Sequence, residues 1–301
     1  MAECTVYELS ELERKQKTID RAPFRNLSIN NTTILDTIEG RMPCERCYAS
    51  RKYFCYHCYL PVIDQVYFPR VKLPIKIDIV KHHREIAGKS TAIHAVILAP
   101  EDVKIYTYPQ IPEILDKEKT VLIFPSKIAI GVKDLFKKEE AEDERGQNST
   151  TVKKIKNMLP IRRAIFIDST WQQTKEIYKD ARLRELRCVI LKSRISQFWR
   201  NQKNCPRWYL ATIEAIHQFL VELHTCAFGI IENYADLDDS TVNREESFII
   251  PNEEYLETYL ATDLRYNGQY DNLLYFFKYM YNKIHTIYDH DKLLAYKRPL
   301  L

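Results

Sequence analysis

The stretch RRAIFIDSTWQQTKEIY, residues 162–178, predicts a buried strand that leads directly into a helix. An apolar run over 164–167 is followed by Asp168, Ser169 and Thr170. Ser169 and Thr170 each have a glutamine three residues later, the spacing of a helix capping box. The helix N-terminus would then face outward from the carboxyl end of a strand, where open α/β sheets bind ligands and anionic groups are favoured. Asp168 is therefore a candidate functional residue.

The chain around this stretch alternates short β-rich runs with helical ones. In addition to 164–168, the pattern predicts strands over 76–80, 91–98, 103–106, 120–124 and 188–191. It predicts helices over 170–179, 208–224 and 253–259, and a long amphipathic helix within 266–288. This alternation indicates an α/β fold with a mainly parallel sheet.

Composition and charge runs suggest further divisions of the chain. The expected organisation is a mobile or peripheral leader over 1–40, a four-cysteine segment over 41–60, a main domain over 61–250 and a helical extension over 251–301. Residues 137–157 carry charge runs without apolar periodicity, which predicts a solvated insertion between two strands.

Four cysteines form two CxxC pairs at Cys44, Cys47, Cys55 and Cys58. Such pairs bring four thiolates to a tetrahedral Zn²⁺. Only seven residues, 48–54, separate the pairs, against roughly 15–20 in a common zinc ribbon. We expect a compact structural zinc knuckle; the alternative is four thiols without a metal.

Overall composition excludes several classes of protein. The six glycines are far apart, so neither a GxGxxG loop nor a GxxxxGK[ST] loop is present. No apolar run approaches the roughly 18 residues that cross a membrane, and the charged N-terminus is unlike a secretory signal. We expect a protein that is not secreted, with its cysteines reduced.

The net charge of the chain is +4, but positive charge is concentrated in the segment 153–208, which holds fifteen Lys or Arg and four acidic residues. Trp171, Tyr178, Phe198, Trp199 and Trp208 are interleaved with these cations. Cations among aromatic rings are typical of surfaces that bind RNA. The alternative is an ordinary solvated helix face.

The turn at Asp168 has two possible interpretations, one chemical and one structural. Its carboxylate could accept the N3 proton of a uracil, orient a ribose hydroxyl or lie near a sulfonium, while Trp171 could stack on a base or adenine ring. The alternative is a purely structural turn, with Ser169 or Thr170 as helix cap and Trp171 in the core.

The segment Asp168-Ser169-Thr170-Trp171 matches the DxTW signature of the DTW-domain family, which the chain resembles over about 41–230. Further matching blocks lie at 82–85 (HHRE), 89–91 (KST), 122–126 (LIFPS) and 210–215 (LATIEA), and the four-cysteine segment also fits. Two positions depart from the pattern: His83 stands where proline is common, and Ala211 where serine is common.

The resemblance implies a SPOUT-like α/β fold, preceded by a small zinc knuckle, with a knotted C-terminal half that binds S-adenosylmethionine. The implied activity is transfer of the 3-amino-3-carboxypropyl group to N3 of a tRNA uridine, at position 20 in the D-loop, giving acp3U and methylthioadenosine. It also implies residence in the nucleus, otherwise the cytoplasm, with no obligate protein partner.

Site residues follow from the same resemblance. Asp168, Thr170 and Trp171 would be catalytic. The cofactor would contact Phe124, Pro125, Ser126, Leu210, Thr212 and Glu214. Nine basic residues are candidates to bind the tRNA backbone: Arg46, Arg51, Lys52, Arg162, Arg163, Lys175, Arg200, Lys203 and Arg207. The alternative functions are an RNA methyltransferase of the same fold and a zinc-knuckle RNA-binding protein without catalysis.

Overall fold

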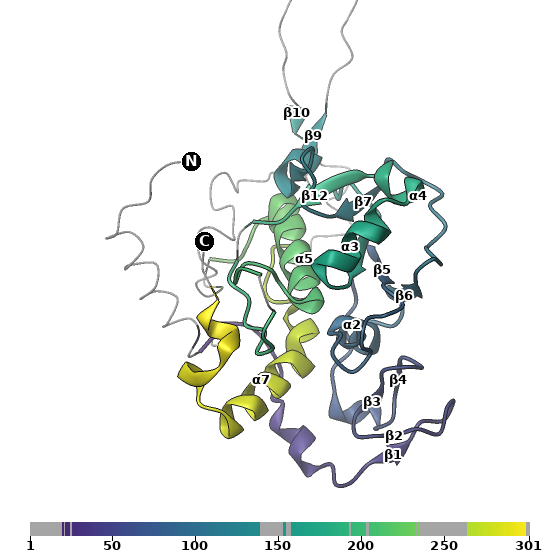
Figure 1. The fold of residues 1–301 in the computed structure, drawn as a ribbon. Coiled ribbons are helices and arrows are strands. Elements are labelled where there is room, and N and C mark those ends of the chain that lie inside the picture. The colour runs from purple at the N-terminus through teal and green to yellow at the C-terminus, as the bar shows by residue number, and fades with distance from the viewer. Residues whose placement is uncertain are drawn as a thin grey trace, which may run out of the picture.

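The computed structural model describes residues 20, 22–24, 26–138, 153–154, 158–192, 194–202, 205–232, 234 and 264–298. Its centre is a six-stranded sheet in the spatial order β6-β5-β11-β7-β12-β8, in which all neighbouring strands are parallel (Figure 1). The strands are β5 (Lys76–Lys81), β6 (Val103–Thr107), β7 (Thr120–Ile123), β8 (Ile130–Gly131), β11 (Arg163–Asp168) and β12 (Arg187–Ile190). The predicted α/β fold with a parallel sheet is confirmed.

The α-helices pack on both faces of this sheet. They are α2 (Ala92–Leu98), α3 (Trp171–Tyr178), α4 (Ala181–Arg184), α5 (Thr212–Phe228) and α7 (Tyr275–Ile287). Short 3₁₀ turns are η1 (Thr33–Thr37), η2 (Gln65–Tyr67), η3 (Val132–Phe136), η5 (Asp271–Leu274), η6 (His290–Lys292) and η7 (Leu294–Lys297). No helix in the described ranges is long and apolar enough to span a membrane.

Alternation along β11 sorts its side chains between the two faces. Ala164 and Phe166 belong to the large core that includes α2, α5 and α7, and the Phe166 ring meets Phe219 of α5 edge to face. Ile165 belongs to the smaller cluster on the other face, with Ile177 of α3. The same alternation assigns Asp168 to the α5 face.

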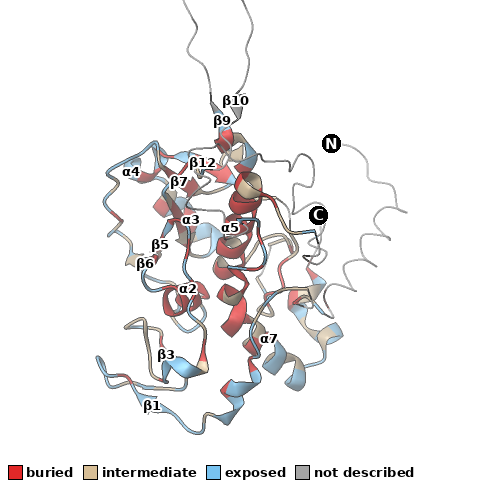
Figure 2. Cartoon of the chain, turned by 180° about the vertical axis from the view of Figure 1, so that it is seen from behind, coloured by how far each residue is buried: buried red, intermediate tan, exposed pale blue. Residues whose placement is uncertain are grey.

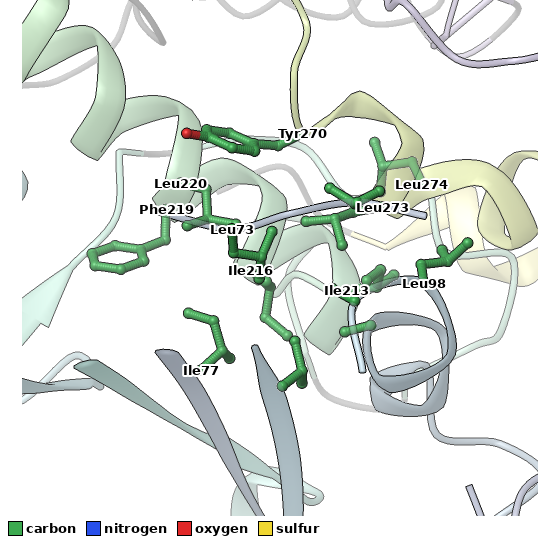
Figure 3. Packing of buried hydrophobic residues seen from close by; sticks show 14 of the residues in the cluster. Leu73, Ile77, Leu98, Ile213, Ile216, Phe219, Leu220, Tyr270, Leu273 and Leu274 are labelled. Atoms are coloured by element: carbon green, nitrogen blue, oxygen red, sulfur yellow. The ribbon is translucent and has the colours of Figure 1, made fainter. Parts of the chain in front are cut away.

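Helix α5 is the centre of the large core. It is buried along most of its length (Figure 2). Ile213 and Ile216 pack among Ile77 of the sheet, Leu98 of α2 and Leu273 of η5 (Figure 3). Because α5 is covered on several sides, even its polar side chains Glu214, His217 and Glu222 are buried, and they are hydrogen-bonded inside the protein.

The predicted strand over 91–98 is wrong, because this run forms α2. All seven residues of α2 are buried, and a short continuous apolar run has no periodicity that separates a buried strand from a buried helix. The side chain of Ser90 accepts a hydrogen bond from the Ala92 N–H (3.2 Å) and thereby caps the first turn.

The other predicted elements differ from the structure mainly at their ends. Helix α5 begins at Thr212 instead of 208, and it ends at Gly229, whose φ of 77° favours glycine. The predicted helix over 253–259 lies outside the described residues. Of the insertion over 137–157, the described part is the antiparallel pair β9 (Lys137–Lys138) and β10 (Lys153–Lys154).

Both ends of the described chain join the main core. Phe24 and Leu35, which we expected in a mobile or peripheral leader, are buried instead, as is Phe277 of the expected C-terminal extension. The backbone N–H of Ser28 donates to Asp271 Oδ2 (2.7 Å), 243 residues away. The boundaries expected at 40 and 251 therefore do not separate independent cores.

Two short hairpins carry the four cysteines. They are β1 (Met42–Pro43) with β2 (Ser50–Arg51), and β3 (Phe54–Cys55) with β4 (Leu60–Pro61). Both lie at one end of the molecule, beside α2 (Figure 1). Phe54 packs the hairpins against the core. Its ring centroid lies 5.0 Å from that of Phe276 in α7 and 5.7 Å from that of His94 in α2.

Candidate functional site

Asp168 ends β11 and accepts hydrogen bonds from two hydroxyl groups. Ser90 Oγ, just before α2, donates to Oδ2 (2.6 Å), and Thr212 Oγ1, the first residue of α5, donates to Oδ1 (2.5 Å). The backbone oxygen of Asp168 also accepts from the His82 N–H (3.1 Å), after β5. The carboxylate thus joins β5, α2 and α5 at the carboxyl edge of the sheet.

The electrostatic environment of this carboxylate is unusual. Asp168 is only 5% exposed, and burial raises its pKa, although the hydrogen bonds from Ser90 and Thr212 and the charge of Lys81 oppose that rise. Glu85 is half-buried nearby, and its pKa is raised by burial and then by the charge of Asp168. Two carboxyl groups with raised pKa values therefore share this edge, as is typical of functional sites.

The turn after Asp168 starts α3 as the capping pattern predicted. Thr170 is the N-cap, and its backbone N–H donates to Gln173 Oε1 (3.1 Å). Trp171 is 36% exposed, and its ring centroid lies 4.2 Å from that of Tyr209. Trp171 is therefore not in the core. It forms an aromatic pair with Tyr209 at the surface.

Of the segments expected to hold the cofactor, one follows β7, the strand next to β11, and the other precedes α5. Phe124, Pro125 and Ser126 come directly after β7, and the Phe124 ring stacks on Tyr178 of α3 at 4.1 Å. Leu210 is half-buried just before α5. Since β7 and β11 are parallel neighbours, the segment 124–126 begins at the same edge as Asp168.

Glu214, also expected to contact the cofactor, lies inside the protein. Its carboxylate accepts hydrogen bonds from Ser196 Oγ (2.6 Å), the Gln197 N–H (2.7 Å) and the Ala211 N–H (2.8 Å). It therefore holds the loop after β12 against the N-terminus of α5. A glutamate three residues into a helix can bond its N-cap without a serine there, which fits Ala211.

The cysteine cluster has the geometry of a metal site. The sulfur atoms of Cys44, Cys47, Cys55 and Cys58 all lie within 4.8 Å of one another, and the Cys47 and Cys55 sulfurs are 3.6 Å apart. Zn–S bonds of about 2.3 Å in a tetrahedron place sulfurs about 3.8 Å apart. The donor set therefore fits Zn²⁺.

The two knuckles repeat the same backbone conformation. Tyr48 and Tyr59 follow the second cysteine of each pair in the left-handed region, with φ of 58° and 59°. Each of these tyrosines donates its N–H to the oxygen of the first cysteine at 2.8 Å. Burial alone would raise the pKa of the Cys55 thiol, yet the backbone N–H groups of Cys58 and His57 lower it to about 6. Such donors favour a thiolate, the form that binds metal.

The nine basic candidates do not form one surface. Arg162 and Arg163 lie at the amino end of β11, the opposite edge from Asp168, and Arg163 pairs with Asp78 at 2.5 Å. Arg207 is 2% exposed, and its two N–H groups bond Asp20 at 2.7 Å. Arg207 therefore anchors the 196–207 loop, and its guanidinium is not free to meet a phosphate.

Of the remaining basic candidates, three gather in one cleft: Arg51, Lys52 and Arg200. Arg46 and Lys175 are exposed on the first knuckle and on α3. Lys203 lies outside the described residues. In the sequence, the nine basic candidates are equivalent positive charges. Only the tertiary structure shows which of them line the cleft, which are exposed elsewhere and which are paired with a carboxylate.

Three residues near Asp168 were not among the candidates: Ser90, Glu85 and Tyr209. Ser90 lies in the block 89–91 and Glu85 in the block 82–85. In the sequence, only the resemblance of these blocks to the family indicated that the two residues could belong to the site. His82 has a structural role there. Its Nδ1 accepts from the Arg84 N–H (3.1 Å), so its Nε2 carries the proton that is donated to Glu176 (3.1 Å).

His94 of α2 is a buried histidine with an unsatisfied atom. It is 2% exposed, and within the described part of the chain its Nδ1 has no hydrogen-bond partner. Burial lowers its pKa from 6.5 to about 3. The folded state therefore binds fewer protons than the unfolded state, so the stabilising contribution is present above pH 6.5 and is lost as the pH falls towards 3.

We predict that His94→Phe makes the protein less sensitive to acid. Between pH 6.5 and 5, the wild type should lose about 2 kcal/mol of unfolding free energy more than the variant. Urea titrations at both pH values measure this difference, and titration of every other group cancels because it affects both proteins. Parallel losses in the two proteins would show that His94 becomes protonated in the folded state.

The fold and the site together define an α/β protein with a parallel sheet, a buried polar centre at its carboxyl edge and a four-cysteine cluster beside it. The DTW domain model matches residues 52–285. The chain therefore belongs to the DTW domain family.

Several relatives are similar over most of their length. The chain is 40% identical over 297 residues to human tRNA-uridine aminocarboxypropyltransferase 1, covering 87% of this chain and 84% of that protein. The protein of the same name from Mus musculus is 37% identical over 288 residues (87% and 84%), and that from Xenopus laevis is 36% identical over 286 residues (87% and 87%). No solved structure is significantly similar to the chain.

Proposed function

We propose that this protein transfers the 3-amino-3-carboxypropyl group of S-adenosylmethionine to a uridine of tRNA. Family membership and relatives named tRNA-uridine aminocarboxypropyltransferase 1 support the activity. The structural observation that carries it is Asp168, a buried carboxylate held by Ser90 and Thr212 where parallel strands end. The proposal includes three further details. The fold is SPOUT-like with a knotted C-terminal half, the product is acp3U at uridine 20, and the protein resides in the nucleus.

The residues at this edge fit S-adenosylmethionine by their chemistry. Asp168 and Glu85 provide negative charge for a cationic sulfonium and ammonium. Trp171 and Tyr209 provide an aromatic surface for an adenine or uracil ring. Bound there, the cofactor would supply the methylene carbon next to sulfur. N3 of uracil would form the new bond to this carbon and lose its proton to solvent, and the C–S bond would break to release methylthioadenosine.

The chain itself must position the two reactants, because the same sulfonium could give up its methyl group instead. Both carboxylate oxygens of Asp168 already accept hydroxyl donors, which supports an orienting role over that of a free base. Thr170 shapes the turn that presents Trp171. The segment 124–126, with Leu210 and Thr212, would hold the cofactor, and Glu214 would keep the adjoining loop in place.

The four cysteines would hold a structural Zn²⁺, with no open position for substrate. The exposed cations Arg46, Lys52 and Lys175 and the half-buried Arg51 and Arg200 would bind the tRNA backbone. Arg163 and Arg207 are left out of this surface because they are committed to Asp78 and Asp20.

Product analysis tests this function. The purified protein, incubated with unmodified tRNA and S-adenosylmethionine, should release methylthioadenosine and form acp3U, both detected by mass spectrometry. A reaction without tRNA is the control. Release of S-adenosylhomocysteine with a methylated nucleoside would instead identify a methyltransferase, and the absence of any product would leave only RNA binding.

A further inference from the structure

A cleft lies between the cysteine hairpins, the segment before α2 and the loop after β12. Five cations line it: Arg41, Arg51, Lys52, Lys89 and Arg200. No carboxylate is among the described residues that line it. A cavity with one sign of charge concentrates ligands of the opposite sign, so this cleft favours an anion.

These cations have little opposite charge close to them: Lys52 acts on the Asp36 carboxylate and Lys89 on that of Glu85, both outside the cleft lining. None of them takes part in an ion pair between described residues. Among the described residues, Arg41 and Arg51 donate side-chain hydrogen bonds only to Ser50, and Arg200 donates weakly to the Gly88 oxygen at 3.4 Å. Burial lowers the pKa of Arg200, as expected for a cation that makes no ion pair with a described residue. A phosphate would supply the missing charge.

The walls of the cleft are aromatic, and this points to more than a bare phosphate. Tyr53, Tyr56 and Trp199 line it, and the Arg51 guanidinium lies 4.0 Å from the Tyr56 ring centroid. Aromatic and guanidinium planes are the usual platforms for unstacked RNA bases.

His94 adds a directional group to this wall. Its side chain lines the cleft, is 2% exposed, and carries the Nδ1 that has no partner in the described structure. A buried polar atom without a hydrogen bond is costly. If the ring turns so that this atom reaches the cleft, the edge of a base, which carries donors and acceptors, would satisfy it.

The cleft is connected directly to Asp168. Ser90 lines the cleft and also donates to Asp168 Oδ2 at 2.6 Å. Thr91 lines the cleft too, and its Oγ1 accepts from the Ile213 N–H at the start of α5 (3.2 Å). A ligand in the cleft would therefore contact the segment that positions the Asp168 carboxylate.

We propose that this cleft is a nucleotide subsite, which binds one unstacked nucleotide of the tRNA beside the target uridine. The phosphate would lie among Arg41, Lys52 and Arg200, and the base would lie against the aromatic wall with an edge on His94 Nδ1. That the nucleotide neighbours the target rests on the proposed function. Binding of RNA in the cleft does not.

The test uses the full-length protein and a fluorescein-labelled tetrauridylate, measured by fluorescence anisotropy. Arg41→Gln with Arg200→Gln should weaken binding by about tenfold and lower the slope of log Kd against log salt by about 0.7, as for one phosphate that is no longer neutralised. Lys72→Gln with Lys133→Gln removes the same charge from exposed sites outside the cleft. That control should bind like the wild type.

A second variant tests the base. His94→Phe keeps the cations and an aromatic ring, so it should weaken tetrauridylate binding about fivefold, as for one hydrogen bond, without changing the salt slope. An abasic tetraribonucleotide should bind the wild type and this variant equally. If the abasic oligomer binds the wild type as tightly as tetrauridylate does, the cleft is a general polyanion site and the nucleotide subsite is overturned.

Activity measurements separate this proposal from the proposed function. Losses in both transfer and tetrauridylate binding for the Arg41 and Arg200 double variant, relative to its control, support the subsite. Normal transfer and binding in that variant overturn the subsite and leave the enzyme intact. If the wild type makes no acp3U but the binding differences hold, the cleft stands as an RNA site and the proposed function fails.

Discussion

Asp168→Asn is expected to lower the rate of aminocarboxypropyl transfer by at least about 100-fold, the scale of losing a preorganised charge in an active site. The variant keeps the size of the side chain but removes the negative charge that would face the sulfonium. It also disturbs the hydroxyl groups of Ser90 and Thr212, which donate to the two carboxylate oxygens. Single-turnover rates with tRNA measure the loss, and Glu113→Gln, at an exposed position, is the control.

The same variant should be as stable as the wild type, or more so, near pH 7. Burial raises the pKa of Asp168, so the folded state holds this proton at pH values where the unfolded state has lost it. The stability that this group contributes is therefore present below the ordinary pKa of aspartate and is lost as the pH rises through the folded value. Asparagine removes this penalty.

Thermal melts from pH 4 to 8 provide the measurement for this second effect. The stability of the wild type relative to the variant should fall as the pH rises. A variant that transfers the group at the normal rate would remove Asp168 from the chemistry. A variant that is inactive but unfolded would show that Asp168 is only structural.

Loss of the metal is the second large effect that we expect. The purified protein should contain one Zn²⁺ per chain, and Cys55→Ser should lose the metal and lower the melting temperature by roughly 10 °C, as for a few kcal/mol in a domain of this size. The effect should reach the core because Phe54, next to this cysteine, packs on Phe276 and His94.

Elemental analysis and calorimetry test this expectation. Cys205→Ser, outside the cluster, is the matched control and should keep its zinc. A strong chelator should lower the melting temperature of the wild type to that of Cys55→Ser and leave the variant unchanged. A full complement of zinc in Cys55→Ser would mean that the metal binds elsewhere.

Much of the fold was accessible from local patterns. The strand that ends at Asp168, the Thr170 cap and the convergence of four cysteines each depend on residues close together in sequence. The prediction for 91–98 failed for the same reason: apart from Thr91 and His94 the run is apolar and it is buried throughout, so no local pattern selects helix over strand. Its state is decided by the buried position between the sheet, α5 and α7.

The sequence by itself determined the α/β class, the strand-turn-helix at Asp168 and the four-cysteine cluster, since hydrophobic alternation, capping and CxxC turns are short-range properties. Only the tertiary structure decided that Ser90, 78 residues away, donates to Asp168, and that Arg207 is bound to Asp20 across 187 residues. The physical reason is that such contacts depend on strand order and on the packing of whole elements, and neither is encoded by the spacing of neighbouring residues.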